Sequence, residues 1–259
     1  IQVRGVTQDA LPALTDGLNK LSLLDPTPEI EARRNVIVAP FWKQGDQTEI
    51  LANELNAVLT ATDAIQTPSK FGFAIDTGVE PLLQDAPADI RLERSSDGTL
   101  LLVANGAMTG KPVTHQTAIA EATALTHWFM DTRQKHARMA KLVAAGVELP
   151  TGHTTPRQVQ QKSPAPGVTP NGTLLGVVFG QLRSETLAAL AAYGPLRLTP
   201  WRMVLVETTN PIPAIHGLIV DPNDALLNVI ACTGSPGCSQ AQIKTRPLAR
   251  ALAGQLPKG

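Results

Sequence analysis

The sequence predicts an α+β protein in which one strand–helix–turn–strand unit occurs twice. Strand-like and helix-like patterns alternate along the 259 residues, and a stretch rich in Pro, Gly, Gln and Thr, 151–170, separates two such runs. The runs also share a short echo, because Asn-Val-Ile occurs at 35–37 and again at 228–230 after the same order of elements. A duplicated unit with a linker between the copies explains both observations.

In the first run, the alternation over 1–6 predicts a strand, and leucines at helical spacing over 11–21 predict a helix. The following patterns predict a strand over 33–40, an amphipathic helix over 48–62, a strand ending at Asp76, a hairpin of 90–93 with 99–104, and a long helix over 113–145.

In the second run, the patterns predict strands over 174–179 and 198–206, helices over 184–192 and 211–218, and a buried strand over 226–231. The last strand leads directly into the loop that holds Cys232 and Cys238. These elements complete the second copy of the unit.

The charge of the chain excludes two broad classes of partner. It carries 22 basic and 22 acidic residues, so no net field attracts nucleic acid or an anionic membrane. Its apolar runs are far shorter than the ~18 residues that a membrane span needs. With only two cysteines and no signal-peptide pattern, the sequence predicts a protein of the reducing cytoplasm.

Cys232 and Cys238 are separated by five residues, on a turn that contains Gly, Ser and Pro. Small residues let the backbone fold closely round a bulky group, and thiolates on such a loop suit a soft metal centre, with an iron–sulfur cluster as the natural candidate. Inert cysteines, a disulfide and a zinc site are the alternatives; zinc would require further ligands, and no histidine lies nearby in sequence. A [4Fe–4S] cluster needs four thiolates, of which this sequence supplies two.

Four segments of the chain occur in the order found in the nitrite and sulfite reductase superfamily, which the whole chain therefore resembles. They are residues 1–5, 34–36, 70–71 and 231–238. The resemblance implies two pseudo-symmetric halves, each with a ferredoxin-like unit and a larger α/β unit. It also implies a [4Fe–4S] cluster bound by Cys-x5-Cys and a following Cys-x3-Cys.

This architecture implies a division of the chain into five segments. We expect a remnant of the first ferredoxin-like unit (1–25), the first α/β domain (26–150), a linker (151–170), the second ferredoxin-like unit (171–222) and the start of the second α/β domain (223–259). On this interpretation the chain is truncated at both ends, and the other two cluster cysteines are expected beyond Gly259.

One position separates the branches of the superfamily. Its sulfite reductases have Lys-x-Lys in the third segment, whereas this chain has Lys70 followed by Gly72. A missing cation there removes a charge that would bind a small anion and support its reduction. The sequence Lys70–Phe73 instead resembles that of precorrin-3B synthases, oxygen-dependent enzymes of aerobic cobalamin biosynthesis.

The resemblance implies a site for an anionic tetrapyrrole, precorrin-3A. Arg34 and Lys70 are expected to act in catalysis and in substrate binding, and Gln2 and Arg4 to contact the substrate, because cationic side chains pair with its carboxylates. For Arg4, and for Arg33 next to Arg34, the alternative is an exposed charge at the end of a strand.

The implied reaction needs O2 and either a reduced pyridine nucleotide or an electron-transfer protein. The alternatives for the function are a sirohaem-dependent nitrite or sulfite reductase and a non-enzymatic protein that binds a tetrapyrrole or a cluster.

Overall fold

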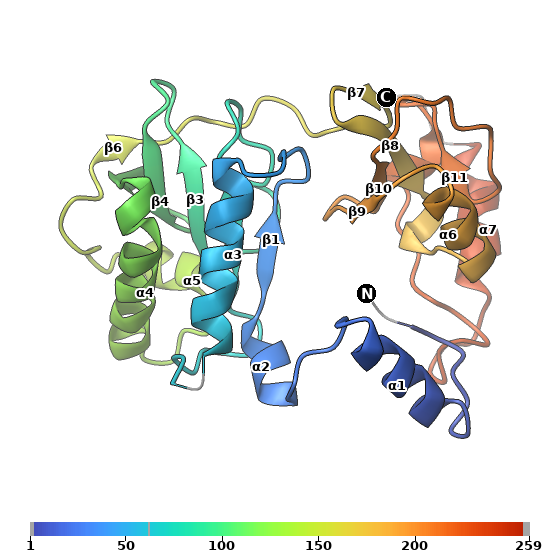
Figure 1. Cartoon of the computed structure of the whole chain (residues 1–259), viewed down its shortest axis with the longest axis horizontal. Coiled ribbons are helices and arrows are strands. Elements are labelled where there is room, and N and C mark those ends of the chain that lie inside the picture. The colour runs from blue at the N-terminus through green and yellow to red at the C-terminus, as the bar shows by residue number, and fades with distance from the viewer. Residues whose placement is uncertain (1–2, 62, 256–259) are drawn as a thin grey trace. The chain divides into compact units, whose positions relative to one another are not determined.

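The computed structural model describes residues 3–61 and 63–255, which divide into two compact units (Figure 1). The larger unit is Gln8–Ser163, and the smaller unit combines residues 3–7 with the described part of 164–259. The two units meet in the chain between Ser163 and Pro164, inside the predicted linker, and between Thr7 and Gln8. Residue 25, where a segment boundary was predicted, lies within the larger unit. Among the described helices, none is long and apolar enough to cross a membrane.

The larger unit is a six-stranded sheet in the order β1-β2-β3-β4-β5-β6, with helices packed against it. Strands β1, β2 and β3 are parallel, and the remaining pairs are antiparallel. The elements in chain order are α1 (Leu11–Lys20), α2 (Pro28–Arg33), β1 (Val36–Val38), α3 (Gln47–Thr60), β2 (Phe73–Asp76), β3 (Ile90–Arg94), β4 (Leu100–Ala104), β5 (Thr109–Pro112), α4 (His115–Thr132), α5 (Met139–Ala144) and β6 (Thr155–Pro156).

The core of this unit forms where α3 and α4, which lie side by side in Figure 1, pack against the sheet. Leucines four residues apart on α3, at 51, 55 and 59, are all buried, as expected for one face of an amphipathic helix. Phe129 of α4 is fully buried, and its ring centroid lies 4.9 Å from that of Phe71. Burying a side chain of this size contributes about 1.5–3 kcal/mol, so α4 is fixed to the segment that leads into β2.

The smaller unit is an antiparallel sheet in the order β11-β8-β10-β9, with β7 also paired to β8. Helix α6 covers it through the buried Leu190, which packs with side chains of β8 and β10. The elements are β7 (Gly167–Thr169), β8 (Gly172–Val177), the 3₁₀ turn η1 (Val178–Gly180), α6 (Ser184–Ala191), β9 (Leu196–Leu198), β10 (Met203–Val206), β11 (Leu218–Ile219), the 3₁₀ turn η2 (Ala225–Asn228) and α7 (Thr245–Ala253).

The long helix predicted over 113–145 is wrong, because it is broken into α4 and α5. Gln134 has a φ of 47°, which a continuing α-helix cannot contain. The carboxylate of the buried Asp89 accepts hydrogen bonds from the Met139 amide at 2.8 Å and from Arg138 Nε at 3.0 Å. Asp89 therefore binds the start of α5, a contact that helical periodicity cannot reveal.

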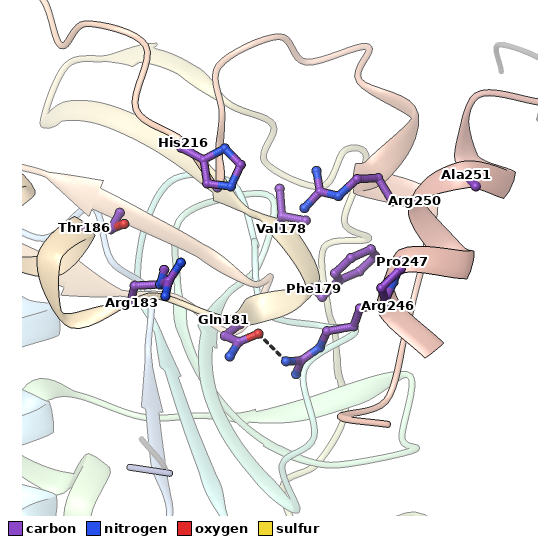
Figure 2. A pocket seen from close by; sticks show the side chains of 11 residues that line it. Val178, Phe179, Gln181, Arg183, Thr186, His216, Arg246, Pro247, Arg250 and Ala251 are labelled. Atoms are coloured by element: carbon purple, nitrogen blue, oxygen red, sulfur yellow. Dashed lines mark hydrogen bonds between the residues drawn. The ribbon is translucent and has the colours of Figure 1, made fainter. Parts of the chain in front are cut away.

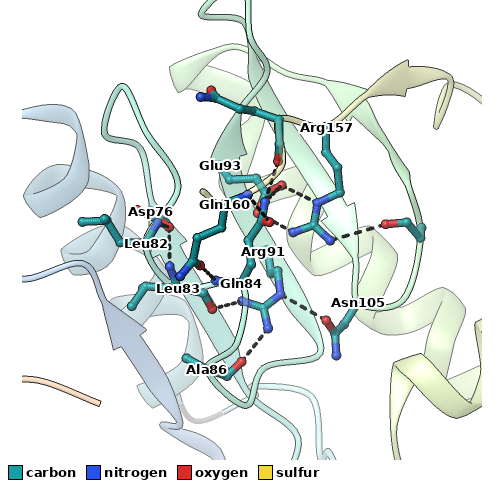
Figure 3. Close-up of polar contacts among 12 residues, drawn as sticks. Asp76, Leu82, Leu83, Gln84, Ala86, Arg91, Glu93, Asn105, Arg157 and Gln160 are labelled. Atoms are coloured by element: carbon teal, nitrogen blue, oxygen red, sulfur yellow. Dashed lines mark hydrogen bonds and ion pairs between the residues drawn. The ribbon is translucent and has the colours of Figure 1, made fainter. Parts of the chain in front are cut away.

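The predicted linker, residues 151–170, contains two short strands, since β6 pairs with β5 and β7 pairs with β8. Between these strands, Arg157 forms a two-pronged ion pair with the buried Glu93, with Nε and Nη2 each 2.7 Å from a carboxylate oxygen (Figure 3). Gln84 and Gln160 each accept the other's backbone amide at 2.9 Å. Polar side chains of this segment therefore form hydrogen bonds within the larger unit.

Four further strand and helix predictions need correction. Residues 3–6 form no strand, and the rest of the predicted strand lies outside the described residues. The predicted strand over 198–206 is a β9–β10 hairpin with Arg202 at a φ of 58°, and the predicted helix over 211–218 is irregular up to β11. The buried strand predicted over 226–231 is η2 followed by irregular backbone, with Ile230 83% exposed.

A distant side chain explains that last difference. Arg202 donates from Nη1 to the carbonyl of Val229 at 2.9 Å and from Nη2 to that of Leu227 at 3.0 Å. These carbonyls are thereby satisfied by a guanidinium instead of a neighbouring strand. The sequence echo at 228–230 thus does not repeat the structure of β1.

Candidate functional site

The cysteine loop of the smaller unit lies between η2 and α7 and is fixed by its backbone. The Ser235 amide donates to the carbonyl of Ile243, and the Cys238 amide donates to that of Gly234, both at 2.9 Å. Gly234 has a φ of 67°, and a Cβ there would lie 2.5 Å from Thr245 Oγ1 and 2.8 Å from the Thr245 amide nitrogen. Only glycine therefore allows this close approach of the loop to the first residue of α7.

Both thiols of the loop are exposed and free. The hydroxyl of Thr245 donates to the carbonyl of Cys232 at 2.8 Å and lies 3.7 Å from the Cys232 sulfur. This hydroxyl, the Gly234 amide and the nearby Arg246 charge lower the pKa of the Cys232 thiol. A thiol with a lowered pKa is better prepared to bind a soft metal, which takes the thiolate.

The donor set fits two ligands of an iron–sulfur cluster. Cys232 and Cys238 have the Cys-x5-Cys spacing, they are exposed, and small residues lie between them. Within residues 3–61 and 63–255 no group of three or more His, Cys, Asp or Glu side chains could hold a metal ion. Any cluster bound here would take its other ligands from outside the described residues.

The second part of the predicted site, Arg34 and Lys70, belongs to the larger unit. Strands β1 and β2 are parallel, with Val36 opposite Phe73, so the residues that precede them emerge at the same edge of the sheet. Lys70 is exposed, whereas Arg34 forms an ion pair with Asp25 through Nε at 2.8 Å. The structure thus brings Arg34 and Lys70 to one edge, with an acidic partner for Arg34 that the sequence did not indicate.

Asn35 ties these two segments together. Its side-chain amide donates to the carbonyls of Ala32 at 2.8 Å, Phe71 at 3.2 Å and Ser69 at 3.3 Å. Two of these acceptors flank Lys70, so the Asn35 side chain determines where the Lys70 backbone lies. Asn35 belongs to the segment 34–36 that carries the resemblance, but its positioning role is evident only from these contacts.

Gly72 is packed against the same residue. A Cβ on Gly72 would lie 3.0 Å from the carbonyl oxygen of Asn35 and 3.3 Å from its Cβ, closer than ordinary van der Waals contact. The Gly72 amide donates to Asp89 Oδ2 at 3.0 Å, which fixes the other end of the Lys70 turn. Position 72 therefore lacks a second ammonium group and also lacks room for a side chain without movement of Asn35.

The remaining predicted residues have different outcomes. Arg33 is not an exposed strand-end charge, because it is 6% exposed and donates to the carbonyls of Leu59 and Ala61, both at 2.9 Å, at the end of α3. Arg4 is exposed and belongs to the smaller unit, and Gln2 lies outside the described residues. Substrate contact by Gln2 and Arg4 stays a prediction.

Comparison with known proteins gives a structural match. No protein-family model and no curated protein sequence matches this chain. The solved structure of the NirA protein of Mycobacterium tuberculosis is similar to it, with a TM-score of 0.54 and 18% sequence identity. The match covers 85% of this chain and 50% of NirA, so the chain spans about half the length of that protein. This similarity confirms the predicted α+β, nitrite/sulfite reductase-like fold.

Proposed function

We propose that this chain is part of an oxidoreductase that acts on an anionic tetrapyrrole, and that its reaction is that of precorrin-3B synthase. The fold supports the superfamily, and the packing of Gly72 supports the branch. Lys70 is exposed at the sheet edge, while position 72 carries no cation and is in close contact with Asn35. Such an edge presents one ammonium group where a Lys-x-Lys segment would present two.

In this proposal Arg34 and Lys70 bind carboxylates of precorrin-3A and orient the macrocycle. The Nε of Arg34 is used by Asp25, and its two Nη groups donate to no acceptor within the part of the chain that the structure describes. Those groups offer the forked geometry that suits a carboxylate. Asn35 holds Lys70 in place, and Gln2 and Arg4 would add contacts from their own segment.

The proposed reaction inserts one oxygen atom into the substrate. Precorrin-3A, O2, two electrons and two protons give the hydroxylated lactone and one water, with the electrons coming from a reduced pyridine nucleotide or an electron-transfer protein. Cys232 and Cys238 would hold part of a [4Fe–4S] cluster, which supplies one-electron transfer when bound. The scarcity of cysteine supports a cytoplasmic location for such a cluster.

The experiment uses the protein that carries this chain, purified and reconstituted without oxygen. Iron and sulfide are counted, the chromophore is extracted, and oxygen uptake is followed after addition of precorrin-3A and a reductant. We expect bound iron and sulfide, no sirohaem, and oxygen uptake that depends on the substrate. Extractable sirohaem with reduction of nitrite or sulfite would replace the proposal by the reductase function. Absence of iron would mean that Cys232 and Cys238 are structural, and it would refute the proposed cluster.

Substitutions at the sheet edge test the roles of its residues. Loss of a charge-assisted hydrogen bond costs about 1.5–3 kcal/mol, so R34Q and K70Q should each lower kcat/KM for precorrin-3A by about 10- to 100-fold. K135Q is the matched control, because Lys135 is an exposed lysine that precedes α5. Equal effects of K70Q and K135Q would mean that Lys70 contributes only net charge.

A further inference from the structure

The smaller unit contains a cavity of about 700 Å³ that the proposed function leaves unused (Figure 2). Its walls come from η1, the start of α6, the loop before β11 and the exposed side of α7. Arg246 and Arg250, one turn apart on α7, extend toward Gln181 and His216 respectively. A cavity of this volume accommodates a small molecule as opposed to a single ion.

The lining of the cavity is cationic without compensation. Its charged groups are the guanidinium groups of Arg183, Arg246 and Arg250, and none of its eleven residues is acidic. The imidazole of His216 adds a hydrogen-bonding group. Outside the lining, Arg183 lies 3.9 Å from Glu185, but both side chains are more than three-quarters exposed (76% and 80%), so this pair contributes little. The positive charges therefore act together on whatever enters the cavity.

The guanidinium group of Arg246 is only partly hydrogen-bonded. One of its Nη groups donates to Gln181, whereas its Nε is buried and has no hydrogen-bond partner among the residues that the structure describes. A buried donor without an acceptor costs about 1–3 kcal/mol. Arg246 is also the second residue of α7, where the positive end of the helix dipole disfavours a cation. An anion bound at this point would offset both costs.

Arg250 is held over an aromatic ring. Its guanidinium carbon lies 5.8 Å from the centroid of Phe179, within the range of a cation–π contact. Phe179 has a φ of 56°, a backbone conformation that costs a non-glycine residue about 1–2 kcal/mol. The strained backbone of η1 therefore places the ring under Arg250 and restricts the guanidinium before any ligand binds.

From these contacts we infer that the cavity formed by Arg183, Arg246, Arg250 and His216 binds a small polyanion with at least two phosphate or carboxylate groups. Two guanidinium groups one helical turn apart can each pair with a separate anionic group. The site lies entirely within the smaller unit and uses neither Arg34 nor Lys70. It is therefore distinct from the proposed Arg34–Lys70 edge, although the Arg246 charge also acts on the nearby Cys232 thiol.

Titration calorimetry of the 259-residue chain at low ionic strength tests the inference, with inorganic pyrophosphate and citrate as separate probes. We expect saturable one-to-one binding of at least one probe. Binding of pyrophosphate alone assigns a phosphorylated ligand, binding of citrate alone assigns a polycarboxylate, and binding of both means that charge spacing dominates. R246Q and R250Q should each raise the dissociation constant by about tenfold or more, which corresponds to about 1.4 kcal/mol.

K135Q removes one positive charge from a residue of the larger unit that does not line the cavity, so it should change the dissociation constant by less than about twofold. R250K keeps the charge and loses the fork, so its affinity should lie between those of the unchanged chain and R250Q. If R246Q does not fold, the exposed Arg250 still provides the test. The inference is overturned if neither probe binds at millimolar concentration, or if K135Q weakens binding as much as R250Q.

Discussion

Removing the Asp89 carboxylate should destabilise the larger unit more than any loss of surface charge. Asp89 is fully buried and accepts from the Gly72 amide at 3.0 Å, the Met139 amide at 2.8 Å and Arg138 Nε at 3.0 Å. In D89A two backbone amides lose their acceptor, at about 1–3 kcal/mol each. Arg138 is 34% exposed and regains water, so its share is at most about 1 kcal/mol. We therefore expect a loss of about 4 kcal/mol in the free energy of unfolding.

Urea unfolding followed by circular dichroism measures this loss, and R138Q is the control that removes only the ion pair. R138Q should cost about 1 kcal/mol or less, because it leaves both amide contacts in place. Hydrogen exchange gives a local measure: the Gly72 and Met139 amides should exchange faster in D89A than in R138Q. Equal losses in the two variants, with unchanged exchange at both amides, would refute the role of Asp89 as a shared acceptor.

Three further substitutions test other buried or strained contacts. Burial and the nearby Glu93 charge raise the pKa of Asp76 from 3.8, so the unchanged protein should lose stability as pH rises through the native pKa. D76N should not show this loss of stability. Urea midpoints measured at several pH values should therefore diverge between the two proteins as pH rises, and parallel pH profiles would contradict the predicted contribution of Asp76. T245V removes a hydroxyl that lowers the pKa of Cys232, so iodoacetamide should label Cys232 more slowly at neutral pH by mass spectrometry; an unchanged rate would exclude that role. G72A should cost about 1–3 kcal/mol in urea unfolding because its Cβ would press on Asn35, and a neutral effect would mean that the loop relaxes freely.

Hydrophobic periodicity correctly predicted the elements that depend mainly on residues close to them in sequence. The predicted helix over 48–62 is α3, and the hairpin of 90–93 with 99–104 is β3 with β4. Their periods of about 3.6 and 2 residues follow from which face is buried. The predictions failed where a distant side chain satisfies the backbone, as Asp89 does at the start of α5 and Arg202 does beyond η2.

The candidate site divides in the same way. Cys232, Cys238, Arg34 and Lys70 became candidates because their types and order match motifs, and their roles stay predictions. The structure places Arg34 and Lys70 at one sheet edge. The Arg246 cavity was not found, since its walls come from segments about 70 residues apart in sequence, from η1 to α7. Basic residues in an amphipathic helix normally indicate a solvated face, so the sequence of α7 gives no signal for it.

Gly72 shows why a residue type alone is a weak guide to the chemistry of this edge. In the sequence, Gly72 occupies the position of the second lysine of a Lys-x-Lys segment. The sequence alone therefore suggests that a single substitution to lysine would restore the second cation. In the structure it lies against the Asn35 carbonyl, while the Asn35 amide holds the backbone on both sides of Lys70. A side chain at position 72 would move Asn35 and with it Lys70, so adding the second ammonium would displace the first. The difference between one and two cations at this edge is therefore a property of the packed loop, and changing it would require coordinated changes at positions 35 and 72.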